Sequence, residues 1–123
     1  MIKNKKDITW YHGSPHKLNQ LDKGSTITPD KDLAKVFSHK PSIVSISDSG
    51  QIKHNGNKKG YLYIIDESID SQDIYLHPDS TMKKGKEWLT TRKLKVRLNE
   101  TVNIKQKNIL SEKEINKIKN KFL

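Results

Sequence analysis

The chain has 123 residues and a formal net charge of +10 at pH 7, from 24 basic and 14 acidic side chains. Only 32% of the residues are hydrophobic and there is no cysteine, which excludes disulfides and thiolate zinc sites and fits a reducing cytoplasm. This length predicts one domain, residues 1–123, with one modest hydrophobic core.

The N-terminal residues 1–7 are lysine-rich and no apolar segment follows them, so they predict a loose lead rather than a secretion signal. No apolar run approaches the length that spans a bilayer. We therefore expect a cytoplasmic protein with no membrane partner.

The basic charge comes almost entirely from lysine, because Arg92 and Arg97 are the only arginines. The lysines are spread along the whole chain rather than gathered in one block. Proteins that read bases favour arginine for its bidentate fork. Compositional bias is thus the favoured reading of the charge, while a nucleic-acid partner on the basic surface stays open.

The first elements in chain order are a short strand over 8–12 and a loop at 13–15. A helix then begins with Thr28 as its cap and Pro29 at its first position, and it ends before Pro41.

This first helix has apolar residues at helical spacing, which predicts that Leu33, Ala34 and Phe37 point inward. The segments 42–47 and 51–54 follow it and predict a hairpin around a turn.

The clearest strand is 60–66, which is rich in aromatic and β-branched residues and is therefore expected to be central. Residues 66–86 are polar and predict a long irregular segment over a site. Strands over 88–91 and 94–98 follow, and a capping box opens a terminal helix over 111–122. The pattern predicts an α+β fold with a small mixed, mainly antiparallel split β-sheet core and few helices.

Functional atoms are concentrated in the stretch Tyr11, His12, Gly13 and Ser14. Histidine is readily used for hydrogen bonding or proton transfer near neutral pH. A glycine beside it lets a flat ligand approach the backbone closely. The alternative is that His12 is a structural residue of a turn. The other histidines lack metal-ligand spacing, so no metal site is expected.

Glu87 is the second candidate, because it opens a predicted strand directly before Trp88. A carboxylate partly desolvated by an indole can stabilise a developing positive charge or bind a ribose hydroxyl. The alternative is a solvated glutamate after a lysine-rich turn. The sequence contains neither a glycine-rich phosphate loop nor a serine-nucleophile elbow.

These residues carry a resemblance to the ADP-ribosyltransferase fold, in its diphtheria-toxin-like or poly(ADP-ribose)-polymerase-like branch. Residues 11–14 resemble its first motif, and 28–37 resemble the segment after its second motif. Residues 60–65 are similar to the central strand of small rifamycin-modifying members and short phage-encoded relatives. Glu87 with the two residues after it, followed by 93–98, resembles the third motif, and the similarity covers roughly residues 9–100.

The resemblance implies an NAD pocket formed by the segment from Tyr11 to Ser14. In it His12 hydrogen-bonds the adenosine-side ribose, and the backbone of Gly13 holds the nicotinamide carboxamide. Glu87 hydrogen-bonds the nicotinamide ribose and steadies the oxocarbenium-like transition state, because a fixed carboxylate stabilises positive charge on the sugar. An acceptor then attacks the anomeric carbon.

The second motif departs from the family. A tyrosine usually stacks on nicotinamide there, whereas this chain has Thr26 or Ser25 at that place. Tyr61, Tyr63 and Tyr75 are candidates to supply the ring from elsewhere.

Three hypotheses follow, and fold alone does not choose among them. The first is a mono-ADP-ribosyltransferase or NAD glycohydrolase whose acceptor is a protein, a nucleic acid or a small molecule. The second is a catalytically inactive module that binds a nucleotide or ADP-ribose. The third is a small basic protein of a phage or mobile element that binds nucleic acid or a host protein.

Overall fold

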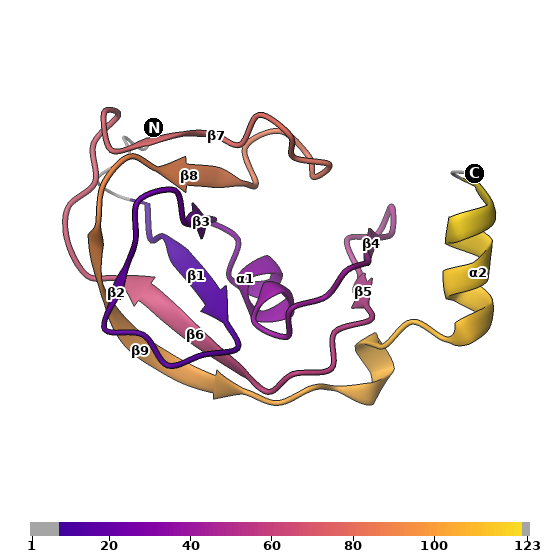
Figure 1. Ribbon diagram of the computed structural model, residues 1–123. Helices are drawn as coiled ribbons and strands as arrows, with labels where there is room; N and C mark the ends of the chain where they lie inside the picture. Colours follow the sequence, from indigo (N-terminus) through magenta and orange to yellow (C-terminus); the bar gives the residue numbers. More distant parts are fainter. Residues whose placement is uncertain (1–7, 122–123) are drawn as a thin grey trace.

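The computed structural model describes residues 8–121, so the predicted lead 1–7 and the last residue of the predicted terminal helix lie outside the described residues (Figure 1). The elements run in the order β1 (Tyr11–Ser14), β2 (Gln20–Leu21), β3 (Thr26–Ile27), α1 (Lys31–Phe37), β4 (Val44–Ile46), β5 (Ile52–His54), β6 (Gly60–Ile65), β7 (Ile74–Leu76), β8 (Trp88–Thr90), β9 (Leu94–Val102), the 3₁₀ helix η2 (Gln106–Asn108) and α2 (Glu112–Lys121). The predicted α+β class is confirmed.

The strands form a four-stranded sheet in the order β1-β6-β9-β2, a three-stranded sheet in the order β3-β8-β7, and the hairpin β4-β5. Every pair of neighbouring strands in them is antiparallel. The sheets curl as a half-barrel around α1, and α2 stands at the far edge beyond the hairpin (Figure 1). The central position expected for 60–66 and the hairpin expected for 42–54 are both confirmed.

A bridge between Tyr11 and Thr28 joins the two larger sheets. Tyr11 N–H donates to the Thr28 carbonyl at 2.8 Å, and Thr28 N–H donates back at 3.0 Å. Thr28 was expected to cap α1 and Pro29 to be its first residue, and both predictions are wrong, because α1 begins at Lys31. Asp30 caps the helix instead, its Oδ1 accepting from Leu33 N–H at 3.1 Å.

Helix α1 lies against β1 and β6 at very close range, and two glycines permit it. A Cβ on Gly13 would lie 1.9 Å from the carbonyl oxygen of Ala34, and one on Gly60 would lie 1.9 Å from Ser38 Oγ. These distances are far below van der Waals contact, so only glycine fits at either position. Strand β1 runs from Tyr11 to Ser14 rather than over the predicted 8–12. Gly13 therefore lies inside the strand and not in the predicted loop.

The main core lies between the two larger sheets and is built from strand and loop residues: Trp10, Leu21, Ile27, Ile65, Ile69, Ile74 and Leu94. The indoles of Trp10 and Trp88 pack edge to face with their centroids 5.7 Å apart. A smaller cluster of Ala34, Leu62 and Val102 lies beneath α1. Strand β8 is therefore anchored through Trp88 directly beside Glu87.

The segment 66–86 was predicted to be irregular, but it contains β7, which pairs with β8. Its acidic residues are held by an arginine: Arg92 Nη1 donates to Glu67 Oε1 at 2.6 Å, and Arg92 Nε donates to Asp73 Oδ1 at 2.9 Å. The Arg92 contacts with both carboxylates fix the connection between β6 and β7 to the turn after β8.

In the C-terminal half, one strand is longer than predicted and the start of the terminal helix is as predicted. Strand β9 continues to Val102, four residues beyond the predicted end at 98. The predicted capping box is confirmed, because Ser111 Oγ accepts from Glu114 N–H and Glu114 Oε1 accepts from Ser111 N–H, both at 3.1 Å. Within residues 8–121, no helix has the length and apolar character needed to cross a membrane.

Candidate functional site

A cavity of about 290 Å³ opens where β1, β3, α1 and the start of β8 meet. Five of the residues that line it were predicted from the sequence as site residues, and two were not. The described residues that line it are Tyr11, His12, Gly13, Thr26, Thr28, Phe37 and Glu87.

Strand pairing explains why residues distant in the sequence meet here. The bridge between Tyr11 and Thr28 places β1 beside β3, and β3 pairs with β8 through Thr26 opposite Leu89. Glu87 precedes β8 by one residue, so it reaches the same cavity as His12.

His12 is oriented by the backbone of β3. Its Nδ1 lies 2.6 Å from the carbonyl oxygen of Thr26. Because a carbonyl only accepts, Nδ1 carries the proton and Nε2 keeps its lone pair. Burial lowers the pKa of His12 below its ordinary 6.5, although the Thr26 carbonyl acts in the opposite direction. The imidazole is therefore a neutral acceptor at pH 7.

Glu87 is half-buried and is held by one hydroxyl. Ser80 Oγ donates to Glu87 Oε1 at 2.7 Å, and Ser80 Oγ itself accepts from Met82 N–H at 3.1 Å. The backbone carbonyl of Glu87 accepts from His77 N–H at 3.0 Å. Within the described chain, no hydrogen bond reaches Oε2, which leaves one carboxylate oxygen for a ligand.

Lys86 ties the start of β8 to the N-terminus of α1. Its ammonium lies 3.0 Å from Asp30 Oδ2, while Asp30 Oδ1 caps the helix through Leu33. Burial raises the pKa of Asp30, but the hydrogen bonds from Lys86 and Leu33 outweigh it and hold that pKa below its ordinary value. This contact fixes the position of the residue next to Glu87.

Gly13 lines the cavity, yet the need for glycine there comes from the helix. The space that a Cβ would occupy is taken by the backbone of Ala34 and Ser38. Close packing of α1 is therefore enough to require glycine at this position.

Two of the expected cofactor-binding residues are not among the described residues that line the cavity. Ser14 is buried and its Oγ accepts from His16 N–H at 3.0 Å. Tyr61 lies opposite Ser14 in the β1–β6 pair, with the Lys17 ammonium 6.0 Å from its ring centroid. Ser14 ends β1 and Tyr61 lies opposite it near the start of β6, so neither of these paired residues lines the cavity.

Besides Tyr11 of β1, α1 supplies an aromatic ring to the cavity. Phe37, the last residue of the helix, lines the cavity, whereas Val36 takes a core position. Tyr63 is not among the described residues that line it, and its hydroxyl accepts from Leu18 N–H at 2.6 Å. Tyr75 lies exposed on β7. Helical spacing predicted that Phe37 points inward but did not distinguish the core from a cavity.

No family model, curated protein or solved structure matches this chain. In the part of the chain that the structure describes, no three histidine, aspartate or glutamate side chains gather closely enough to hold a metal ion. The geometry of the cavity is therefore the basis for a functional proposal.

Proposed function

We propose that this protein is an ADP-ribosyltransferase-like enzyme that cleaves NAD and transfers ADP-ribose to an acceptor or to water. The observation that carries the proposal is the meeting of His12 and Glu87 in one cavity, together with Gly13 and Thr26. The order of the sequence motifs is the second support.

His12 would bind a ribose hydroxyl. Its Nδ1 proton is engaged by the Thr26 carbonyl, so Nε2 is an acceptor for a hydroxyl proton. The pKa lowered by burial keeps this nitrogen unprotonated at neutral pH. A charged imidazolium would have no lone pair for this bond.

Glu87 would stabilise the transition state. When the bond between the anomeric carbon and the nicotinamide nitrogen breaks, the electron pair leaves with nicotinamide and positive charge builds on the sugar. A carboxylate fixed by Ser80 stabilises that charge without needing to reorganise. The acceptor then forms a bond to the anomeric carbon and loses a proton.

The aromatic surface for nicotinamide would come from Phe37 with Tyr11, because the second-motif position has Thr26. The cavity volume of about 290 Å³ lies at the lower end of the range of about 300–1,000 Å³ for small-molecule sites. It therefore suits the nicotinamide ribose end of NAD rather than the whole dinucleotide.

The test is release of nicotinamide from NAD by the purified protein and by Glu87→Gln. We expect release by the wild type and a fall of about 100-fold or more in Glu87→Gln, as for loss of a group that stabilises transition-state charge. Glu112→Gln is the matched control, because Glu112 is exposed on α2. Equal turnover by Glu87→Gln and the wild type would contradict the role of Glu87.

A binding module without catalysis is the second candidate, favoured by the absence of a ring at Thr26. Calorimetry with NAD and ADP-ribose separates the two functions. Binding that depends on His12 with no nicotinamide release identifies the module.

A further inference from the structure

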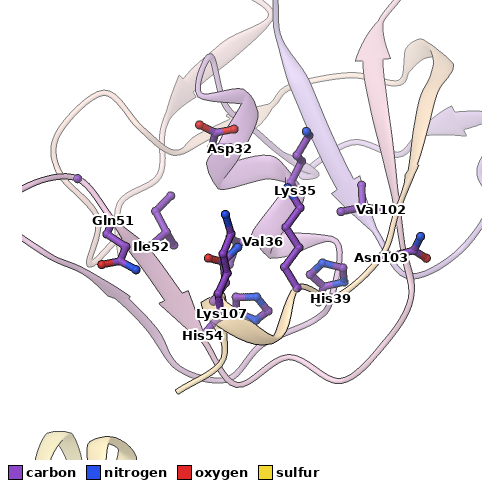
Figure 2. Close-up of a pocket in the computed structure, with 13 residues that line it drawn as sticks. Asp32, Lys35, Val36, His39, Gln51, Ile52, His54, Val102, Asn103 and Lys107 are labelled. Carbon is purple, nitrogen blue, oxygen red and sulfur yellow. The ribbon is translucent and has the colours of Figure 1, made fainter. Parts of the chain in front are cut away.

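A second cavity of about 310 Å³ lies on the other face of α1, between that helix, β5 and η2. It shares no lining residue with the cavity at His12 and Glu87. Residues from α1 and η2 meet the strand β5 around it, as Figure 2 shows. What this cavity does is therefore independent of the function proposed above.

Two stacked histidines lie at the base of this cavity. The rings of His39 and His54 are 5.3 Å apart between centroids and nearly parallel, at 12°. Both residues are at least 97% buried, with 3% and 2% of their surface exposed. Buried histidines with polar edges need partners, and within residues 8–121 each ring has one hydrogen-bond partner.

Those single partners fix different tautomers. His39 Nδ1 lies 2.7 Å from the carbonyl oxygen of Lys58, so this nitrogen carries the proton. His54 Nδ1 accepts from Gly56 N–H at 3.0 Å, so the proton of His54 is on Nε2. The pair therefore offers one free acceptor, His39 Nε2, and one free donor, His54 Nε2–H.

Both histidines line the cavity, and neither of their free nitrogens is sealed in the core. Of the side chains that the structure describes, Trp10 Nε1 is the only buried nitrogen or oxygen without a hydrogen-bond partner. Among the described residues neither Nε2 has a hydrogen-bond partner, and neither nitrogen is fully buried, so each keeps accessible surface. Figure 2 shows the two rings side by side at its base.

The rim of the cavity is basic. Lys35, Lys105 and Lys107 line it against a single acidic residue, Asp32. Lys35 already pairs with Glu100 at 3.0 Å, whereas neither Lys105 nor Lys107 forms an ion pair within residues 8–121. Asp32 is set apart from the two imidazoles (Figure 2). Two lysines that form no ion pair within residues 8–121 therefore line the same cavity as the N–H donor of His54.

We propose that this cavity binds the phosphate group of a phosphorylated ligand. A phosphate has several acceptor oxygens, which suit Lys105, Lys107 and the N–H of His54 together. A hydroxyl on the ligand, or on the protonated phosphate itself, would satisfy the free acceptor of His39. A cation is disfavoured because it would face the lysines.

The test is calorimetric titration of the full chain with inorganic phosphate, adenosine monophosphate and a short single-stranded oligonucleotide. Saturable binding is expected, and the tightest of the three identifies the source as free phosphate, nucleotide or nucleic acid. Lys105→Gln/Lys107→Gln should weaken that affinity by about ten-fold or more. Lys23→Gln/Lys93→Gln, which removes the same charge at exposed positions outside the cavity, should change it by less than about two-fold.

The histidines give a readout that needs no variant. Nitrogen-detected spectra of the wild type should show His39 protonated on Nδ1 and His54 on Nε2, and phosphate should shift the Nε2 resonance of His54. The proposal is overturned if none of the three ligands binds saturably, or if the two lysine pairs weaken binding equally. It is also overturned if phosphate leaves His54 unshifted.

Discussion

The Nδ1 of His12 donates to the carbonyl oxygen of Thr26 across 2.6 Å, and this contact decides what His12 can do. It ties β1 to β3 beside the bridge at Tyr11, and it leaves Nε2 as an acceptor within the cavity. Thr26 takes part in this contact through its backbone carbonyl and not through its side chain.

The neutral state of His12 predicts acid sensitivity. Burial lowers the pKa of His12, and burial with the nearby His39 lowers that of His54, both from 6.5. Below pH 6.5 the unfolded chain therefore binds more protons than the folded one, so the free energy of unfolding falls as the pH drops towards the folded pKa values. Denaturant unfolding between pH 7.5 and 5 should show this fall, and His12→Asn should reduce it. A variant with the unchanged wild-type slope would argue against a neutral, buried His12.

Ser80 is predicted to position Glu87 within the proposed reaction. Removing its hydroxyl in Ser80→Ala frees Glu87 Oε1, so kcat for nicotinamide release should fall by about ten-fold with KM little changed. Ser80→Thr keeps a hydroxyl and should restore most of kcat. A proportional rise of KM in Ser80→Ala, with kcat intact, would instead indicate a role in binding.

The contact between Lys86 and Asp30 is predicted to hold the turn before β8. Asp30→Asn keeps a helix cap for Leu33 but loses the ion pair, so amide hydrogen exchange in residues 83–87 should quicken while stability changes by less than about 1 kcal/mol. Asp30→Ala loses both contacts and should cost about 1 kcal/mol more, as for other lost caps. Unchanged exchange in Asp30→Asn would show that Lys86 does not fix this turn.

Gly13 is predicted to be a packing requirement. Gly13→Ala puts a Cβ 1.9 Å from the Ala34 carbonyl, so α1 must move and the free energy of unfolding should fall by about 2 kcal/mol or more. Gly24→Ala is the control, because it meets nothing within 4 Å and suffers only from its φ of +85°, a cost of about 1 kcal/mol. Urea unfolding of both variants measures the difference, and equal losses would remove the steric explanation.

Arg92 is predicted to be the more important of the two arginines for stability. Arg92→Gln should lower the free energy of unfolding at pH 7 by about 1–2 kcal/mol, since it breaks charged hydrogen bonds to Glu67 and Asp73. Arg97→Gln should change it by less than about 0.5 kcal/mol, because Arg97 and Asp66 are more than half exposed and 3.7 Å apart.

The contacts of Arg92 with Glu67 and Asp73 also predict a pH dependence of the free energy of unfolding. A hydrogen bond from the Lys95 backbone, helped by Arg92, lowers the pKa of Glu67, and Arg92 lowers that of Asp73. Their contribution is present above the ordinary values of 4.5 and 3.8 and is lost as the pH falls through the folded values. Arg92→Gln should therefore lose less stability than the wild type on acidification. An identical acid transition in both proteins would contradict this linkage.

The elements whose signals are local could be predicted from the sequence alone. The capping box at Ser111 and Glu114, the central strand β6 and the hairpin of β4 and β5 depend on neighbouring residues and on propensity, so they were predictable. The sequence also singled out His12 and Glu87 as residues with chemistry suited to a ribose.

Which of these residues meet depends on contacts between segments far apart in the chain. The pairing of β3 with both β1 and β8 is non-local, and no periodicity encodes it, yet it brings His12 to Glu87. The same packing sent Phe37 to a cavity and placed Ser14 and Tyr61 outside it, because helix and strand patterns specify a buried face without naming what lies opposite. The stacked His39 and His54 were likewise invisible in the sequence, since their contact depends on how α1 and β5 pack.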